Sequence, residues 1–208
     1  MRIVDFIVPC ENERIKFSMR GVLISDNLAK ALCCTVPFIY GIYEVEYASN
    51  SVTDIISPLL IMSAFANPSV RRYTYVNNAG RTTFKRVFDE LTKAWDMKFI
   101  EVNLSRSISQ LEILEKLSKS FSYNLLKLNI SGNSLSINAA RILNLFLLKQ
   151  QYIKDLNLSR CRLSNQSARY IIDALNRNVT IRHLNMAYND LASSIYEFGI
   201  KISSMLTR

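Results

Sequence analysis

The sequence has no long apolar run, although apolar residues make up 49% of it. No stretch approaches the roughly 18 residues that a membrane-spanning helix needs. Glycine and proline are also scarce, with 5 and 4 residues, which excludes a disordered chain and favours a sizeable buried core. The first nine residues are too short, and with Asp5 too polar, for a secretory signal. We therefore expect an intracellular protein, cytoplasmic or nuclear.

Residues that carry catalysis or bind metals are few. The chain has one histidine, His183, and none of its four cysteines stands in a CxxC pair or at zinc-ligand spacing. Phosphate-loop, dinucleotide-binding and zinc-protease motifs are missing as well. The sequence offers His183 no evident nucleophile partner. It therefore predicts a non-enzymatic protein with no cofactor, no metal site and no catalytic residue.

Acidic residues are scarce only in the second half of the chain. The net charge is +9, and residues 1–96 hold 11 basic and 10 acidic residues, against 15 and 7 in residues 97–208. A basic half of this kind attracts nucleic acid, acidic proteins or anionic membranes, or is simply a solvated surface.

What the sequence does contain is a repeat of about 28 residues. Segments 125–135, 153–163 and 181–191 align without gaps and share the pattern L-x-x-L-x-L-x-x-N/C-x-L. Less regular copies begin near residues 99, 70, 42 and 14, so residues 14–208 hold about seven units. Units of this size bury their core only by stacking on one another. Residues 1–13 continue the period, and we expect them to form a half-repeat cap with one helix.

Each unit predicts a strand, a turn and a helix. The apolar positions of the strand point inward, including Tyr47, Tyr73 and Tyr75. Segments 84–91 and 168–175 carry apolar residues at helical spacing. An asparagine just past the strand is suited to bonding the backbone of the turn. This column holds Asn50, Asn78, Asn133 and Asn189, with Cys161 as a substitute and departures at Val22 and Ser107.

The repeat resembles the ribonuclease-inhibitor class of leucine-rich-repeat proteins. The resemblance runs from Arg14 onward and is strongest over residues 125–191. It implies an α/β solenoid shaped as a horseshoe arc, with parallel strands on the concave face and helices on the convex face. Members of this class are mostly intracellular binding scaffolds. They include GTPase activators like that of Ran, actin-regulatory proteins and centrosomal or ciliary components. The resemblance therefore implies protein partners and a place in a larger intracellular assembly.

Two rows of side chains are expected on the concave face, at the outward positions of the strands. The first row alternates in charge almost throughout and comprises Lys16, Glu44, Arg72, Glu101, Lys127, Asp155 and His183. The second row is polar and ends in four asparagines, Asn103, Asn129, Asn157 and Asn185. Each row has two interpretations. The side chains pair along the row, or they bind a partner.

The excess positive charge predicts a basic rim on turns and helices. Its candidate residues are Arg106, Arg160, Arg162, Arg177 and Arg182. Two alternative functions follow from this rim. One is binding of nucleic acid or ribonucleoprotein, and the other is GTPase activation through an arginine finger on a turn. Against the second, no specific catalytic arginine is identified, and the acidic tail common among such activators is missing from the sequence.

The last apolar positions of the sequence have nothing after them to cover them. These positions are Ile195, Phe198, Ile202 and Met205. Because solenoid ends need polar caps, we expect a partner, self-association or further sequence to cover this end.

Overall fold

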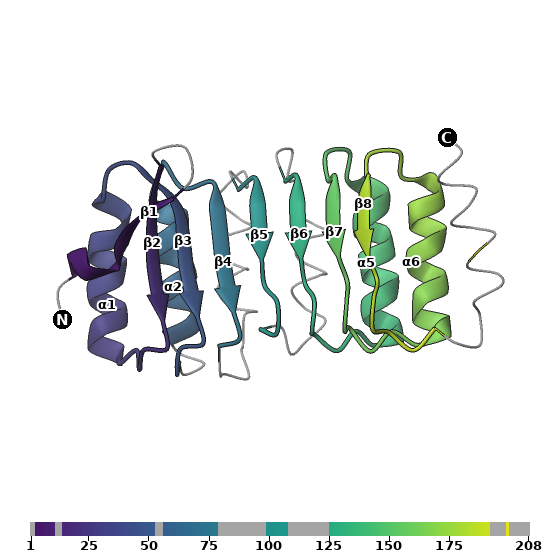
Figure 1. Ribbon diagram of the computed structural model, residues 1–208, viewed down its shortest axis with the longest axis horizontal. Helices are drawn as coiled ribbons and strands as arrows, with labels where there is room; N and C mark the ends of the chain where they lie inside the picture. The colour runs from purple at the N-terminus through teal and green to yellow at the C-terminus, as the bar shows by residue number, and fades with distance from the viewer. Residues whose placement is uncertain are drawn as a thin grey trace.

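The structure is a computed structural model, and it describes residues 3–10, 14–52, 56–78, 99–107, 125–191 and 199. Within these residues, one sheet of eight strands runs in chain order from β1 to β8 (Figure 1). Strands β2 to β8 are parallel, and β1 is antiparallel to β2. The α/β class and the mostly parallel sheet agree with the prediction from the sequence.

The parallel strands recur at the spacing of the repeat. They are β2 (Arg14–Arg20), β3 (Ile42–Ala48), β4 (Arg72–Val76), β5 (Glu101–Asn103), β6 (Lys127–Asn129), β7 (Asp155–Asn157) and β8 (His183–Asn185). Paired residues are one unit apart, as Glu44 is from Arg72 and Lys127 from Asp155. Residues at one repeat position therefore line up in a row across the sheet.

Four helices connect successive strands in the described part of the chain. They are α1 (Asp26–Thr35), α2 (Ile56–Ala66), α5 (Ile137–Lys149) and α6 (Asn165–Arg177). In Figure 1, α2 and α5 lie behind the strands, α1 lies beside β2 at the N-terminal end, and α6 lies beyond β8 at the C-terminal end. A serine caps three of them, since Ser25, Ser136 and Ser164 each accept a bond from a backbone N–H of the first turn. The predicted helix at 84–91 lies outside the described residues.

The core lies between the sheet and these helices. One inward row of the strands is buried and comprises Phe17, Val45, Tyr73, Val102, Leu128 and Leu156. The prediction that Tyr47, Tyr73 and Tyr75 face the core is confirmed. The hydroxyl of Tyr47 lies 2.9 Å from Ser63 Oγ, and that of Tyr75 bonds Ser57. Helix serines thus give two buried phenols a polar partner.

The predicted asparagine column occupies the turns after the strands. Asn50 Oδ1 accepts from Val22 N–H, and Asn133 Oδ1 accepts from Ser107 N–H. The amide groups donate to carbonyls of the neighbouring unit, as Asn78 Nδ2 does to Tyr47 O at 3.0 Å. Cys161 substitutes in the column with a weaker bond from Sγ to Ile130 O. Each asparagine therefore ties its own turn to the unit before it.

The N-terminal segment differs from its prediction. We expected a helix at 1–13, but the described residues form a short 3-10 turn, η1 (Ile3–Phe6), and the strand β1 (Ile7–Cys10). The physical reason is the open edge of β2, whose unpaired backbone groups an antiparallel strand satisfies better than a helix. Pro9 is tolerated because β1 is the edge strand of the described sheet.

Candidate functional site

The face of the sheet opposite the described helices carries the candidate site, and we call it the open face. The strand pairing places the charged candidates in one row, as the repeat spacing predicted. Neighbours in this row are Lys16, Glu44, Arg72, Glu101, Lys127, Asp155 and His183. Parallel strands lie about 4.8 Å apart, so each charge stands next to charges of the opposite sign.

Ion pairing along the charged row is strongest on its N-terminal side. Lys16 Nζ lies 2.8 Å from Glu44 Oε1. Arg72 Nη2 donates to Glu101 Oε1 at 3.0 Å, while Arg72 Nε lies 3.0 Å from Oε2 without the alignment of a hydrogen bond. Lys127 is held more loosely, with Nζ 3.5 Å from Glu101 Oε1. The last pair, His183 and Asp155, is 3.9 Å apart. The row thus pairs with itself at its start and loosens toward its end.

A second charge cluster lies on β2 and β3. Glu46 is 4% exposed, and its Oε2 accepts from Ser18 Oγ at 2.6 Å and from Arg20 Nε at 2.8 Å. Lys16 Nζ is 3.1 Å from the same oxygen. Burial raises the pKa of Glu46, but these bonds outweigh burial and hold it below its ordinary range. Sequence reasoning missed Arg20 in this cluster, because Arg20 ends its strand and reaches sideways to a neighbour.

The asparagines form the second row of the open face, and we call Asn103, Asn129, Asn157 and Asn185 the amide row. Each uses its Oδ1 within its own turn, to accept from the backbone N–H two residues on, at 3.0 to 3.1 Å. The amides therefore do not bond along the row, which was one of the two interpretations of the sequence, while binding of a partner by this row stays a prediction. The motif N-x-S at the first three positions is the signal of such a turn.

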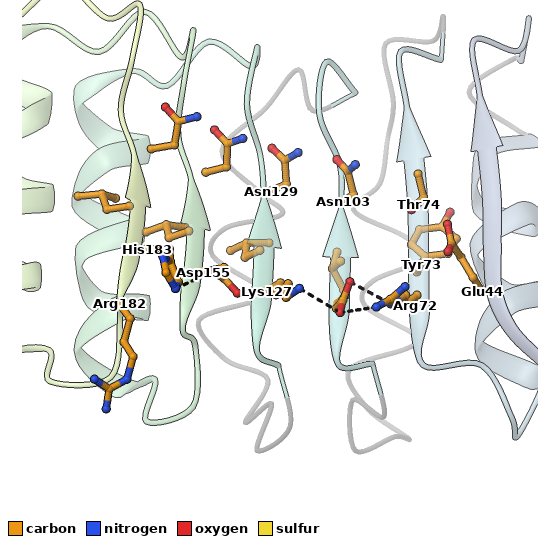
Figure 2. Close-up of a pocket in the computed structure, with 17 residues that line it drawn as sticks. Glu44, Arg72, Tyr73, Thr74, Asn103, Lys127, Asn129, Asp155, Arg182 and His183 are labelled. Atoms are coloured by element: carbon orange, nitrogen blue, oxygen red, sulfur yellow. Dashed lines mark hydrogen bonds and ion pairs between the residues drawn. The ribbon is translucent and has the colours of Figure 1, made fainter. Parts of the chain in front are cut away.

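A hollow of about 580 Å³ lies on the open face across β3 to β8. Figure 2 shows the charged row along its middle, with Asn103 and Asn129 beside it toward the ends of their strands. Exposure rises toward the C-terminal side, from 12% for the Glu44 side chain to 52% for Lys127 and 76% for His183. Arg182, predicted as part of a basic rim, lines this end of the hollow.

The five arginines of the predicted basic rim divide into two groups. Arg106, Arg160 and Arg162 lie in turns that follow strands, whereas Arg177 ends α6 and Arg182 precedes β8. Because the strands are parallel, the first group lies where the strands end and the second lies where they begin. The five arginines therefore form no single rim. All five are exposed. In the first group, the Arg160 guanidinium lies 4.6 Å from the centre of the Tyr188 ring.

Other predicted features are missing from the described residues or fall outside them. The apolar set at the C-terminal end, Ile195, Phe198, Ile202 and Met205, lies outside the described residues. In the part of the chain that the structure covers, no group of three or more histidine, cysteine, aspartate or glutamate residues is arranged to hold a metal ion. Within the same part, no helix has both the length and the apolarity to cross a membrane.

Comparison with known proteins gives a partial similarity. No family model matches the chain. Over 75 residues, the chain is 33% identical to the mouse protein named "NACHT, LRR and PYD domains-containing protein 4E". The match covers 36% of this chain and 7% of that protein. This similarity supports a chain of the leucine-rich-repeat type.

Proposed function

We propose that this protein is a leucine-rich-repeat solenoid of the ribonuclease-inhibitor type and that it works as a non-enzymatic scaffold that binds proteins. The observation that carries the proposal is the open face, where polar side chains stand in rows over a hollow of about 580 Å³. The 13-residue helices α5 and α6 between successive strands support the ribonuclease-inhibitor form. The partial similarity to a protein with LRR in its name supports the same class. A scaffold of this kind would be a subunit of a larger intracellular assembly.

The chemistry of the open face favours a protein partner. Acidic and basic groups alternate, so the face has no uncompensated positive charge of the kind that nucleic acid needs. Among the described residues that line the hollow, Tyr73 is the one tyrosine, phenylalanine or tryptophan, and its side chain is buried. Bases would therefore find no exposed tyrosine, phenylalanine or tryptophan to stack on there.

The test is affinity capture with matched variants of the full chain. The open-face variant replaces Lys127, Asp155 and His183 with alanine, and these side chains have only the looser ion pairs. The control replaces the exposed Arg141, Lys149 and Gln166 of the helices with alanine. Lysates are treated with nuclease, washed at low and high salt, and analysed by mass spectrometry. We expect a defined set of proteins that the wild type and the control retain and the open-face variant loses.

Other outcomes of this capture separate the alternatives. Partners that disappear with nuclease or modest salt would replace the proposal with nucleic-acid binding through the basic residues. A small GTPase among the retained proteins would favour a GTPase activator. In that case, substitution of one turn arginine, Arg106 or Arg160, would abolish stimulation without weakening binding. Equal retention by the open-face variant and the control would remove the open face as the binding surface.

A further inference from the structure

We propose that the amide row binds an extended peptide segment of the partner, and that Nδ2 groups of the row donate hydrogen bonds to its main-chain carbonyls. The peptide would cross the strands along the row, with one or two acidic side chains toward Lys127, Arg182 and His183. This inference rests on the proposed function and adds the chemistry of the ligand to it.

The oxygen of each amide in the row is engaged. Asn129 Oδ1 accepts from Ser131 N–H at 3.0 Å, and Asn157 Oδ1 accepts from both the N–H and the Oγ of Ser159. These short-range bonds fix the side-chain orientation of each amide. They also decide which atom faces outward, because an amide that directs its oxygen into the turn directs its nitrogen away from it.

The nitrogen of each amide in the row is available. For the described part of the chain, no hydrogen bond from Nδ2 of Asn103, Asn129, Asn157 or Asn185 to another protein atom is present. The first three are partly buried and the last is exposed. A primary amide group carries two N–H donors, and neighbouring strands lie about 4.8 Å apart. The row is therefore a line of oriented donors that can bond acceptors of a ligand.

The side chains beside the C-terminal part of the row are mainly donors too. The side chains of Lys127 and His183 are 52% and 76% exposed, and Arg182 lines the same end of the hollow. Asp155 is the one carboxylate among them. A ligand rich in acceptors fits this arrangement, and a few acidic side chains would add charge-assisted bonds to it.

A peptide fits this site better than a nucleic acid or a polysaccharide. The carboxylates of Glu44, Glu101 and Asp155 line the hollow and would repel a chain of phosphates, whereas neutral main-chain carbonyls tolerate them. Sugar hydroxyls donate as well as accept, whereas each amide oxygen of the row already accepts at least one hydrogen bond within its turn. Carbonyl oxygens of an extended peptide need only donors, and donors are what the row presents.

The test is a selection of peptides from a random display library on the full-length protein. The first variant is Asn129→Asp/Asn157→Asp, in which a carboxylate oxygen keeps the bond to the turn but the N–H donors are lost. The second is Asn129→Ser/Asn157→Ser, which removes the amides without adding charge and still allows a side-chain oxygen to accept in the turn. The matched control is Gln151→Glu/Gln166→Glu, which makes the same charge change at exposed positions away from the open face.

We expect selected peptides, enriched in aspartate and glutamate, to bind both amide-row variants at least about tenfold more weakly than the wild type. Fluorescence anisotropy gives the dissociation constants, and the control should match the wild type. Thermal melting by circular dichroism verifies that each variant folds. The side-chain amide resonances of the row in ¹⁵N-labelled protein should shift on peptide addition.

Several results would overturn the inference. They are a selection that yields no peptide, peptides that bind the amide-row variants as well as the wild type, and amide resonances that shift with oligothymidylate instead. None of these results removes the proposed function, which depends on partners lost by the open-face alanine variant. Conversely, if that variant lost no partner while peptides bound through the amides, the inference about the row would stand without the broader proposal.

Discussion

At the scale of single residues, Gly132 occupies a turn position that other residues fill only at a cost. Its φ is +70°, and a Cβ added there would lie 2.6 Å from Cγ of Arg106. Arg106 has a positive φ of its own, 51°, at the equivalent position of its turn. Gly132→Ala should therefore lower the free energy of unfolding by about 1–3 kcal/mol.

The same pair gives a double-mutant cycle. Arg106→Ala removes the atom that meets the added Cβ but not the backbone strain at residue 132. The double variant should recover part of the loss, with a coupling of at least about 0.5 kcal/mol in urea unfolding. Strict additivity of the two changes would mean that Arg106 moves away freely and that the contact has no energetic weight.

Glu46 predicts how stability depends on pH. Its pKa is held below its ordinary value of 4.5 in the folded protein, so its ionised form contributes stability above that value. This contribution is lost as the pH falls through the folded-state pKa. Glu46→Gln should cost about 1–3 kcal/mol at neutral pH, because bonds from Ser18 and Arg20 lose their charged acceptor.

The measurement is chemical unfolding of the wild type and Glu46→Gln at several pH values. The difference in unfolding free energy should shrink steadily on acidification below about pH 4.5. Ser18→Ala serves as a control, since it removes one bond from the same carboxylate but leaves the ionisable group in place. A difference that stays constant from neutral to acidic pH would show that the charge of Glu46 does not stabilise the fold.

At the scale of the repeated element, the turn asparagines tie one unit to the next. Asn133 is 3% exposed, and its Nδ2 donates to Leu104 O at 3.0 Å and to Ile130 O at 2.7 Å. Asn133→Ala would leave these carbonyls and Ser107 N–H without their partner. We expect a loss of about 2–4 kcal/mol in thermal or chemical unfolding.

At Cys161, in the same column, an asparagine can be introduced instead of removed. Burial raises the pKa of its thiol to about 11, against backbone hydrogen bonds from Asn133 and Gly132 that lower it. An asparagine oxygen accepts such bonds better than sulfur, so Cys161→Asn should keep or raise stability by up to about 1 kcal/mol, while Cys161→Ala should lower it. Equal stability of the two variants would mean that this unit does not use the column.

Repeat spacing alone predicted the strand register and the inward tyrosines, because one period aligns equivalent residues across a parallel sheet. Three features needed the structure. The antiparallel strand β1 pairs with the open edge of β2, and the repeat pattern does not predict this pairing. The amide orientation depends on turn geometry that only the N-x-S motif hints at. Arg160 and Arg182 lie at opposite ends of the strands, since Arg160 follows β7 and Arg182 precedes β8.

At the scale of the whole molecule, the net charge of +9 does not describe the open face. The charged residues that line the hollow are balanced, with Glu44, Glu101 and Asp155 against Arg72, Lys127 and Arg182. Binding at this face should therefore release few counterions. We expect the affinity for a captured protein partner or a selected peptide to change less than about tenfold between roughly 50 and 200 mM salt.

Titrations at several salt concentrations measure this dependence, and the open-face alanine variant provides the baseline. A ligand that neutralises six to ten positive charges loses about a thousandfold or more in affinity over the same range. A loss of that size would place the binding energy on the exposed arginines of the turns and helices. A weak dependence of affinity on salt would place the binding energy on the hydrogen bonds and paired charges of the open face. Salt screens interactions between groups a few ångströms apart far less than interactions between distant charges.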